Sequence, residues 1–464
     1  MDTEVLIVGA GPTGMVLANE LQLAGVPCVL ADRLPRRSEL SKAGGLQSRT
    51  QQAFDQRGLL EPLLATGDYP LATPHFAGNL LPLVQDRHRF PWRSIPQVAV
   101  EGMLEKHLAA QGIQVARNRE LTGLAQDSAG VTATFADGSS VRASYLVAAD
   151  GGRSTVRKLL GADFPGRPGT ATVLAADVRL RGEPTTHTTI VDGYRAQIFS
   201  LGTDPEGRPL RRLSLAGPDS PASRDVPVTE DEIRDGLRIV YGDRVELLEL
   251  RYARRITNAA RQAAQYRHGR VFLAGDAAHV HLPIGAQGMN TGIQDALNLG
   301  WKLAAAVQGW APDGLLDSYH AERHPVGAAV LRNVQAQSLL MDNGNPDADA
   351  ARAVFADLVR LPEVQRRLDD VLSGMGIRYA DGGHPLVGLP AAGLDAELRG
   401  GRGVLADPDG QFDVLAKPWA DRVVRVAAGA EAMLVRPDGY VAWAGDPDLL
   451  PTALRNWFGN AGLR

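Results

Sequence analysis

Three glycines near the N-terminus recur at a spacing that suits phosphate binding. Gly9, Gly11 and Gly14 follow the short apolar segment 5–8 and open a segment with helical periodicity. In a strand–loop–helix unit, the first glycine allows the tight turn, the second lets the backbone approach a pyrophosphate, and the third allows close helix packing. Asp32 stands about twenty positions later, where an acidic side chain can bind a ribose hydroxyl. The motif predicts a dinucleotide site without deciding which dinucleotide binds.

A second candidate loop follows the apolar segment 145–149. Asp150, Gly151 and Arg153 stand at the start of the run DGGRSTVR. Taken alone, this run indicates a capped turn, in which Asp150 ends a strand and Ser154 caps a short helix. Its chemical interpretation depends on the other two loops.

A third candidate loop follows the apolar segment 270–274. Gly275 and Asp276 come directly after this predicted strand, at the position where ligands bind in open α/β sheets. The stretch 283–290, rich in glycine, then leads toward a long helix. The polar residues of this loop are therefore expected at the same edge of the sheet as the first motif.

The long helix after this loop is predicted over about 291–308. Thr291 and Gln294 fit a capping box at its start. The N-terminus of such a helix offers backbone donors to an anion, and it would stabilise the negative charge of a reduced flavin.

Other chemistries compete for the same residues. Asp276, His279 and His281 could bind a metal ion, but no further Cys or His completes a familiar ligand spacing. A serine hydrolase is disfavoured, because no Gly-x-Ser-x-Gly elbow follows a strand. Cys28 lies in an apolar run and is expected to be a small core residue rather than a reactive thiol.

Composition limits the class of protein. The 464 residues are 44% apolar and 22% charged, which is ordinary for a globular chain of about three domains. A net charge of −4 gives no positive field for nucleic acid or acidic membranes. One cysteine permits no internal disulfide and fits a reducing, cytoplasmic compartment. We find no apolar segment of membrane-spanning length and no secretory signal, so neither a membrane nor export is expected.

The loops must be positioned by a sheet of buried strands. Segments 5–8, 27–31, 145–149 and 270–274 are short and apolar, as strands covered on both faces are. Between them, residues 169–257 alternate like an antiparallel sheet with one helix. Further helical regions are predicted at 50–64, 315–341 and 350–375, a linker at 380–398, and short strands with a terminal helix over 399–464.

In this order, the three loops resemble those of the FAD-dependent aromatic hydroxylases that share the para-hydroxybenzoate hydroxylase fold. Segments 269–279, 298–304 and 317–325 are most similar to the actinobacterial branch of rifampicin, tetracycline and angucycline monooxygenases. The resemblance has specific motifs over residues 1–330 and is more general beyond them.

The resemblance implies an α/β fold with a Rossmann-like FAD-binding domain, an antiparallel-sheet substrate domain and a small thioredoxin-like C-terminal domain without cysteines. We expect the FAD-binding domain at 1–168 with 258–380, the substrate domain at 169–257 and the C-terminal domain at 381–464. Without cysteines the last domain cannot perform dithiol chemistry, so packing or assembly is its expected role.

The resemblance also assigns site residues. The pyrophosphate would meet the loop 9–14, Asp32 would bind the ribose where the family usually has Glu, and Lys42 stands where the family often has Arg. The full set of expected FAD-binding residues is Gly9, Gly11, Pro12, Thr13, Gly14, Asp32, Arg33, Lys42, Gln97, Asp150, Arg153, Gly275, Asp276, Pro283, Gly285, Gly288, Met289 and Asn290. Pro283 and Gly285 would face the flavin ring, and no acid–base side chain is assigned.

The resemblance implies a monooxygenase that adds one oxygen atom of O2 to an aromatic or polycyclic polyketide-type molecule through a flavin C4a-hydroperoxide. NADPH or NADH would be a transient co-substrate, because no second dinucleotide motif is present. The protein would be a monomer or homodimer. Candidate pocket residues, none of them singled out, are Phe76, Trp92, Tyr194, Phe199 and Met289.

Three alternatives stay open at this point. The same scaffold could perform Baeyer–Villiger insertion, or it could be a flavin dehydrogenase or reductase that does not use O2. A binding or inactivated paralogue, in which FAD is structural, belongs to a different class. The intact residues Gly9, Gly11, Gly14, Asp150 and Asp276 argue against that last alternative.

Overall fold

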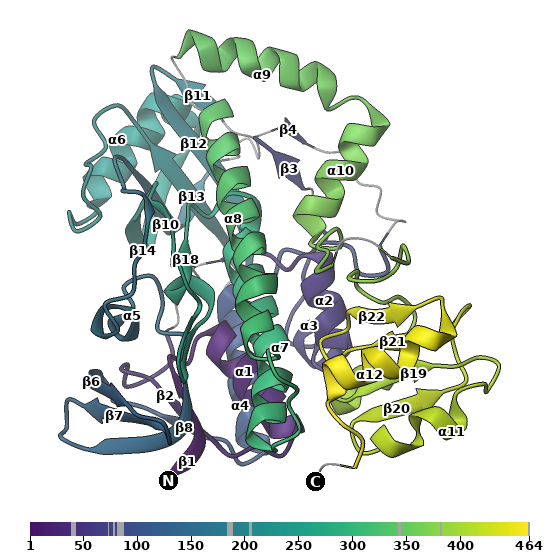
Figure 1. The fold of residues 1–464 in the computed structure, drawn as a ribbon. Coiled ribbons are helices and arrows are strands. Elements are labelled where there is room, and N and C mark those ends of the chain that lie inside the picture. Colours follow the sequence, from purple (N-terminus) through teal and green to yellow (C-terminus); the bar gives the residue numbers. More distant parts are fainter. Residues whose placement is uncertain are drawn as a thin grey trace.

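The computed structural model describes residues 1–38, 43–72, 74–77, 79–80, 88–182, 189–203, 207–341, 345–380 and 383–462. Its largest sheet has eight strands in the order β16-β17-β8-β1-β2-β5, with β7 paired to β8 and β6 paired to β7 (Figure 1). Strands β17, β8, β1, β2 and β5 run parallel. The strands are β1 (Thr3–Val8), β2 (Cys28–Ala31), β5 (Val115–Ala116), β6 (Leu121–Gln126), β7 (Val131–Phe135), β8 (Ser140–Ala148), β16 (Arg267–His268) and β17 (Val271–Leu273).

Two helices beside this sheet pack closely because a glycine lies at their contact. Helix α1 (Pro12–Leu23) lies against α7 (Gln287–Val307) and α4 (Gln97–Ala110). A Cβ built on Gly300 of α7 would lie 2.4 Å from the Cβ of Glu20 in α1. Any larger residue at 300 would push the two helices apart, and with them the loops that precede each helix.

The second sheet is antiparallel, in the order β11-β12-β13-β10-β14. One face packs on α6 (Glu230–Tyr241) through apolar side chains such as Leu213 and Leu237. Some of the alternate residues are charged, and Arg212 forms a two-point ion pair with Asp177 at 2.7 and 2.8 Å. The strands are β10 (Thr172–Arg181), β11 (Thr189–Val191), β12 (Tyr194–Thr203), β13 (Pro209–Ala216) and β14 (Glu246–Thr257).

Short pairings connect the two large sheets. Strand β15 (Ala260–Gln262) pairs with β9 (Gly166–Arg167) and with β18 (His279–Val280). A two-stranded ribbon is formed by β3 (His75–Phe76) and β4 (Asn79–Leu80). The chain therefore returns from the second sheet through β15, which pairs with β18, the strand that follows the loop containing Asp276.

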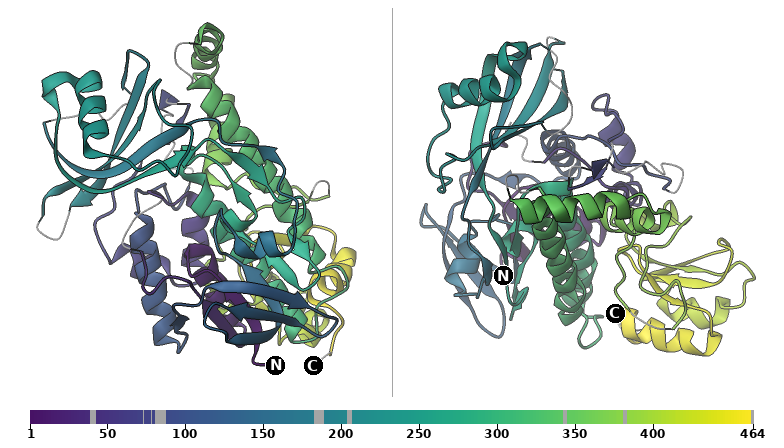
Figure 2. Two further views of the ribbon diagram at one scale, coloured as in Figure 1. Left: turned by 90° about the vertical axis from the view of Figure 1, so that its left-hand side faces the viewer. Right: turned by 90° about the horizontal axis from the view of Figure 1, so that it is seen from above.

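Helix α8 (Asp317–Leu340) runs from the large sheet to the second sheet, and α9 (Pro346–Leu358) lies across its far end (Figures 1 and 2). The helical region predicted at 350–375 is divided, because Pro362 starts a separate helix, α10 (Pro362–Ser373). The helix predicted near 50–64 is likewise two helices, α2 (Ser48–Asp55) and α3 (Leu60–Leu64).

The C-terminal region is a small α/β unit. Its sheet has the order β20-β19-β21-β22, with β19 parallel to β20 and antiparallel to β21. It lies on the opposite side of the molecule from the second sheet (Figure 2). The elements are β19 (Gly403–Ala406), α11 (Asp413–Ala416), β20 (Val423–Val426), β21 (Met433–Val435), β22 (Val441–Ala444) and α12 (Leu450–Phe458).

Buried charges attach this C-terminal unit to the helices of the large sheet. Arg436 lies 2% exposed, with Nε 3.0 Å from Asp438 and Nη2 3.1 Å from Glu322 of α8. Lys302 of α7 donates to the same Glu322 at 2.7 Å. Each of these buried charges therefore has a partner of opposite sign, and removing one partner would leave a buried charge uncompensated.

Separate hydrophobic clusters form around the large sheet, around the second sheet and α6, and within the C-terminal unit. This distribution supports domain boundaries near 168, 257 and 380, which stay a prediction. Over the described ranges, none of the helices combines the length and the apolar character that crossing a membrane requires.

Candidate functional site

The first glycine loop connects β1 to α1 at the carboxyl end of the parallel strands. Gly9 has a φ of +108°, and a Cβ built on it would lie 2.3 Å from the carbonyl oxygen of Ala149. A Cβ on Gly14 would lie 1.9 Å from the carbonyl oxygen of Gly9. A Cβ on Gly11, by contrast, would meet nothing within 4 Å. Gly9 and Gly14 are thus required by packing, whereas Gly11 borders open space.

The N-terminus of α1 faces this space without a side-chain cap. Gly11 precedes the helix, and Pro12 occupies its first turn, where a missing N–H removes no hydrogen bond. The free N–H groups of the first turn and the helix dipole together attract an anion. The arrangement suits a pyrophosphate.

Asp32 directly follows β2, and backbone N–H groups hold its carboxylate in place. Its Oδ2 accepts a hydrogen bond from the backbone N–H of Ala10, and its Oδ1 accepts one from Leu34, both at 2.8 Å. Each carboxylate oxygen retains a lone pair that can accept a ribose hydroxyl. Arg33 is exposed, and Lys42 lies outside the described residues.

Asp150 follows β8 and has one satisfied and one unsatisfied oxygen. Its Oδ2 accepts from the backbone N–H groups of Thr155 and Val156 at 2.7 and 3.2 Å. Its Oδ1 is buried and has no hydrogen-bond partner among the described residues. Burial raises the pKa of this carboxyl group above its ordinary value. An unpaired buried oxygen beside the glycine loop indicates a position where a ligand hydroxyl or amide would donate.

The turn after Asp150 is also capped, as its sequence predicted. Ser154 Oγ accepts from the N–H of Arg157 at 3.0 Å and starts the short helix α5 (Thr155–Leu159). Arg157 then donates to the carbonyl oxygens of Ala277 at 2.7 Å and Gly152 at 2.9 Å. This arginine, which was not among the expected site residues, holds the second loop against the third. Only its place in the DGGRSTVR run could have indicated it.

The third loop meets the first one through Thr13. A Cβ built on Gly275 would lie 2.7 Å from Thr13 Oγ1, and one on Gly292 would lie 2.5 Å from the same atom. Gly275 and Ala277 are buried, whereas the side chain of Asp276 between them is exposed. The three loops therefore converge, and the carboxyl group of Asp276 is presented at their junction.

Helix α7 begins earlier than predicted. It starts at Gln287, directly after Gly285 and Ala286, which have φ of +70° and +51°. The expected capping box is wrong, because Thr291 lies inside the helix and its Oγ1 donates to the carbonyl oxygen of Gln287 at 2.8 Å. No side chain caps the actual start. The first turn of α7 thus offers a second set of free backbone N–H donors, directly after the loop 283–286.

The side-chain amide of Asn290 bonds to other parts of the protein. Its Nδ2 donates to the carbonyl oxygens of Gly45 at 3.1 Å and Ala286 at 2.7 Å, and its Oδ1 accepts from the N–H of Gln47 at 3.0 Å. Asn290 therefore positions the start of α7 against the segment 43–47.

The remaining expected residues lie near these elements. Gln97 is the first residue of α4, is buried, and donates to Glu101 at 2.7 Å. Pro283 is exposed, Met289 is half-buried, and a Cβ on Gly288 would lie 3.6 Å from the ring of His281. Arg153 is exposed and forms an ion pair with Asp225 of the second sheet's domain.

A network of buried polar and charged side chains holds the third loop in place. Asp295 Oδ2 accepts from Gly275 N at 3.0 Å and lies 2.9 Å from His279 Nε2. Asp295 Oδ1 accepts from Arg323 Nε at 2.7 Å. Although Asp276, His279 and His281 cluster in sequence, no group of three such side chains in the described part of the chain is arranged to hold a metal ion.

An apolar cluster adjoins the loop 283–286. Phe76, the only expected pocket aromatic in this cluster, is buried and stacks on Phe355 of α9 with ring centroids 5.0 Å apart. Ile284 packs against the same cluster. Phe199 is 44% exposed on the second sheet, and Tyr194 packs toward α6. Phe76 thus lies next to the predicted flavin loop.

Taken together, these features fit an FAD molecule. Two uncapped helix starts and the open space at Gly11 suit its phosphates and the ring system that becomes anionic on reduction. The unpaired Oδ1 of Asp150 and the exposed carboxylate of Asp276 suit its hydroxyl groups.

Comparisons with known proteins agree with this fit. Residues 2–334 match a family described as an FAD binding domain. Residues 386–461 match the C-terminal domain of aromatic-ring hydroxylases. The two matches cover the loops described above and the small C-terminal unit.

Full-length relatives and solved structures are similar over nearly the whole chain. A rifampicin monooxygenase from Streptomyces venezuelae is 41% identical, covering 99% of both chains. The anhydrotetracycline hydroxylase OxyS from Streptomyces rimosus is 39% identical and superimposes with a TM-score of 0.89 over 100% of both chains. The Diels–Alderase PyrE3 of pyrroindomycin biosynthesis is 35% identical, with a TM-score of 0.85 over 99% of this chain and 100% of that one.

The α/β fold class predicted from the sequence is confirmed by these structures, as is the resemblance to FAD-dependent aromatic hydroxylases. The named relatives include several monooxygenases, and the cofactor of the matched domain is FAD. The chain therefore belongs to the FAD-binding aromatic-ring hydroxylase family and is a flavin-dependent monooxygenase.

Proposed function

We propose that this enzyme hydroxylates an aromatic or polycyclic, polyketide-type molecule, with O2 as the oxygen source and NADPH or NADH as electron donor. The substrate class is supported by similar proteins whose names refer to rifampicin and anhydrotetracycline. It is also supported by the apolar cluster of Phe76, Ile284 and Phe355, because stacked aromatic side chains favour a flat, apolar ligand.

One observation carries the proposal: two uncapped helix starts meet at one edge of the sheet. The N-termini of α1 and α7 are brought together by Thr13, which contacts Gly275 and Gly292. One helix start suits the diphosphate and the other suits the reduced ring, so a single extended dinucleotide would span both.

We assign the expected site residues to this cofactor as part of the proposal. The loop 9–14 would bind the diphosphate, Asp32 the ribose, and Asp276 the ribityl chain. The loop 283–290 would border the ring. Asn290 and Gln97 would act as positioning residues, since their side-chain groups already bond to other parts of the protein.

When bound, FAD supplies the electron transfer and the oxygen chemistry. The chain's own contribution is geometric and electrostatic. The backbone donors of α7 would stabilise negative charge at the ring, and Arg157 and Asp295 hold the second and third loops in place. The cluster around Phe76 excludes water from one side of the loop 283–286, which favours transfer of oxygen to the substrate over its loss to solvent.

Two finer expectations belong to the same proposal. We propose a cytoplasmic enzyme, supported by the single cysteine, Cys28, whose thiol pKa is raised to about 11 by burial and which is therefore unreactive. We also propose a monomer or homodimer that needs no macromolecular partner for turnover.

The test begins with the purified protein. We expect bound FAD and consumption of O2 and nicotinamide nucleotide that increases with polycyclic aromatic phenols. With 18O2, the product should gain one labelled oxygen, and its structure by NMR should show a new hydroxyl group on an intact ring. A ring-expanded ester would instead indicate Baeyer–Villiger insertion, and bound FAD without O2 uptake would indicate a reductase or a cyclising enzyme comparable to the Diels–Alderase relative.

A further inference from the structure

One turn of the C-terminal unit, residues 436–440 between β21 and β22, packs against the helices of the large sheet. The N–H of Gly439 donates to the carbonyl oxygen of Arg436 at 2.9 Å and closes the turn. Gly439 has a φ of +81°, and a Cβ built on it would lie 2.6 Å from Oε1 of Gln56, the residue after α2. The turn therefore approaches α2 as closely as a residue without a side chain allows.

The turn 436–440 is also bonded to two of these helices. Arg57, which follows α2, donates to the carbonyl oxygen of Pro437 at 2.7 Å, and Arg49 of α2 donates to that of Asp438 at 2.6 Å. Asn298 of α7 donates to the carboxylate of Asp438 at 3.2 Å. Backbone and side-chain groups of one turn are thus fixed by helices on the large sheet's side.

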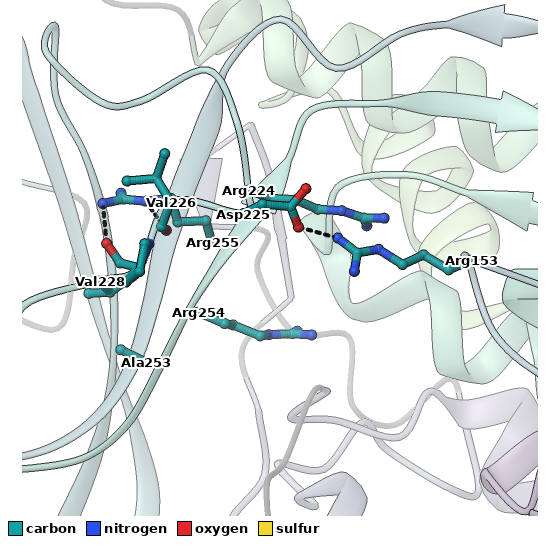
Figure 3. A pocket seen from close by; sticks show the side chains of 9 residues that line it. Arg153, Arg224, Asp225, Val226, Val228, Ala253, Arg254 and Arg255 are labelled. Atoms are coloured by element: carbon teal, nitrogen blue, oxygen red, sulfur yellow. Dashed lines mark hydrogen bonds and ion pairs between the residues drawn. The ribbon is translucent and has the colours of Figure 1, made fainter. Parts of the chain in front are cut away.

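The second sheet's domain meets the loop after β8 in a different way. The ion pair there, between Arg153 and Asp225, has side chains that are 58% and 74% exposed (Figure 3). Such a pair contributes little to holding two parts together, because water screens its charges. In the turn 436–440, by contrast, Arg436 and Asp438 are each 2% exposed in their pair. Buried contacts therefore fix the C-terminal unit, and they can also fix the residues that it meets.

Tyr379 lies between this turn and the flavin site. Its ring packs on the ring of Tyr440 with centroids 4.1 Å apart. Its N–H donates to the carbonyl oxygen of Gly388 at 3.0 Å, and the N–H of Gly388 donates to that of Val441 in β22 at 2.9 Å. Its hydroxyl oxygen accepts from Nη1 of Arg323 at 3.0 Å. Tyr379 is thus held by the C-terminal unit and contacts a residue that supports the flavin site.

Arg323 connects this contact to two elements of the flavin site. Its Nε donates to Asp295 at 2.7 Å, and Asp295 accepts from the N–H of Gly275 in the third loop. Its Nη2 donates to the carbonyl oxygen of Thr291, near the start of α7, at 3.1 Å. Each guanidinium nitrogen therefore has its own acceptor, and the side chain has no exposed surface. Because a buried donor without an acceptor is costly, loss of one acceptor favours a shift of the whole guanidinium group.

We propose that Tyr379 is a positioning residue for the flavin and that the turn 436–440 acts on the flavin through it. The hydroxyl of Tyr379 sets the guanidinium group of Arg323, which sets the third loop through Asp295 and the start of α7 through Thr291. The C-terminal unit, which has no cysteine, thereby influences the flavin by its position. The inference rests on the proposed function, because that function places the flavin ring at the start of α7.

The experiment compares two variants that each remove one hydroxyl group from the same pair of stacked rings. Tyr379→Phe removes the acceptor of Arg323 Nη1. Tyr440→Phe removes a buried hydroxyl group for which the described ranges of the chain offer no hydrogen-bond partner. In both variants, bound FAD is characterised by its absorbance spectrum, its dissociation constant and its midpoint potential.

Tyr379→Phe should weaken FAD binding several-fold, shift the flavin absorbance spectrum and make the midpoint potential more negative. The potential falls because a displaced α7 start stabilises the reduced ring less well. Tyr440→Phe should leave all three quantities at their wild-type values. Urea unfolding of the apoproteins, measured in parallel, separates an effect on the flavin from an effect on the fold.

A double-mutant cycle tests whether the turn acts through Tyr379. Tyr440→Leu removes the ring on which Tyr379 packs, so it should shift the midpoint potential in the same direction as Tyr379→Phe. In the Tyr379→Phe background, Tyr440→Leu should add little, because the hydroxyl group through which it acts is already absent. The comparison of Tyr379→Phe with Tyr440→Phe decides the proposal even where Tyr440→Leu does not fold.

Three results overturn the proposal. The first is a wild-type midpoint potential and FAD affinity in Tyr379→Phe, even where its apoprotein unfolds more readily. The second is an equal shift in Tyr379→Phe and Tyr440→Phe. The third is an equal effect of Tyr440→Leu with and without the Tyr379 hydroxyl group. None of these measurements needs turnover, so a wild-type enzyme that binds FAD without O2 uptake would count against the proposed function alone.

Discussion

Arg323 Nε lies 2.7 Å from Asp295 Oδ1, and neither side chain has any exposed surface. The second oxygen of Asp295 holds the N–H of Gly275 at 3.0 Å, at the start of the loop that presents Asp276. A buried ion pair therefore connects α8, α7 and the candidate flavin site. Its strength should control both folding and cofactor retention.

Asp295→Asn should lower both the free energy of unfolding and the retention of FAD. The substitution leaves the charge of Arg323 buried and unpaired, which costs about 3–5 kcal/mol of unfolding free energy. It also weakens the acceptor for Gly275, so FAD should dissociate more readily. Urea unfolding and the temperature of FAD release measure the two effects. Asp317→Asn is the control, because this carboxylate is 71% exposed in its pair with Arg267; equal losses in both variants would contradict the assignment.

The Asp295–Arg323 pair also predicts how the free energy of unfolding depends on pH in the acidic range. Burial alone would raise the pKa of Asp295, but Arg323 and His279 outweigh it and lower the pKa to about 2. In the unfolded chain this pKa is about 3.9. A depressed carboxyl pKa stabilises the fold fully above the unfolded value and loses that effect as pH falls toward the folded value. Between pH 4 and pH 2 the group should therefore account for about 2 kcal/mol of lost stability. Denaturant titrations at several acidic pH values should show this slope, and Asp295→Asn should reduce it.

Gly11→Ala should separate ligand binding from folding. A Cβ at this position meets no protein atom within 4 Å, so the variant should unfold at nearly the same denaturant concentration as the wild type. The methyl group would occupy the space assigned to the FAD diphosphate, and FAD affinity should fall about tenfold or more. Gly400→Ala, which also meets nothing within 4 Å but lies in the C-terminal region, should change neither property. Unaltered FAD affinity in Gly11→Ala would remove the diphosphate from this loop.

Asp150→Asn should have effects of opposite sign on the apoprotein and on the FAD complex. Burial raises the pKa of Asp150, so its charge is unfavourable in the fold at neutral pH. The amide removes that charge while its oxygen can still accept from Thr155, so the apoprotein should be as stable or more stable. The Nδ2 group would replace the unpaired acceptor Oδ1, and FAD should bind more weakly. Apoprotein unfolding and fluorescence titration with FAD distinguish the two effects, and unchanged FAD affinity would mean that Oδ1 faces no ligand group.

The parts of this site that depend on short sequence spacing were predictable. Gly9, Gly11 and Gly14 span the loop and the first turn of α1, so their common role follows from local geometry. The start of α7 was not predictable, because Ala286 adopts a left-handed conformation that is uncommon for alanine and that moves the helix start ahead of Thr291. The sequence offered a plausible capping box, but the loop's tertiary contacts through Asn290 decided the outcome.

Contacts between distant segments were also beyond sequence reasoning. Arg436 pairs with Glu322 across 114 positions, and Arg153 meets Asp225 across 72. Charged residues are common on surfaces, so nothing in the sequence indicates that the first pair is buried and the second exposed. Only the packing of the C-terminal unit and of the second sheet shows which charges face one another.

Phe355→Ala tests the proposed substrate side of the flavin loop. Phe355 stacks on Phe76 in the cluster that includes Ile284, so its removal opens a cavity next to the loop 283–286. We expect a several-fold higher KM for polycyclic substrates and more nicotinamide nucleotide oxidised per product, because water reaches the site. FAD content should not change, since no FAD-facing element is altered. Leu358→Ala, on the same helix but 45% exposed, is the matched control. If both variants keep the wild-type KM and coupling, the substrate does not approach the flavin from the side of α9.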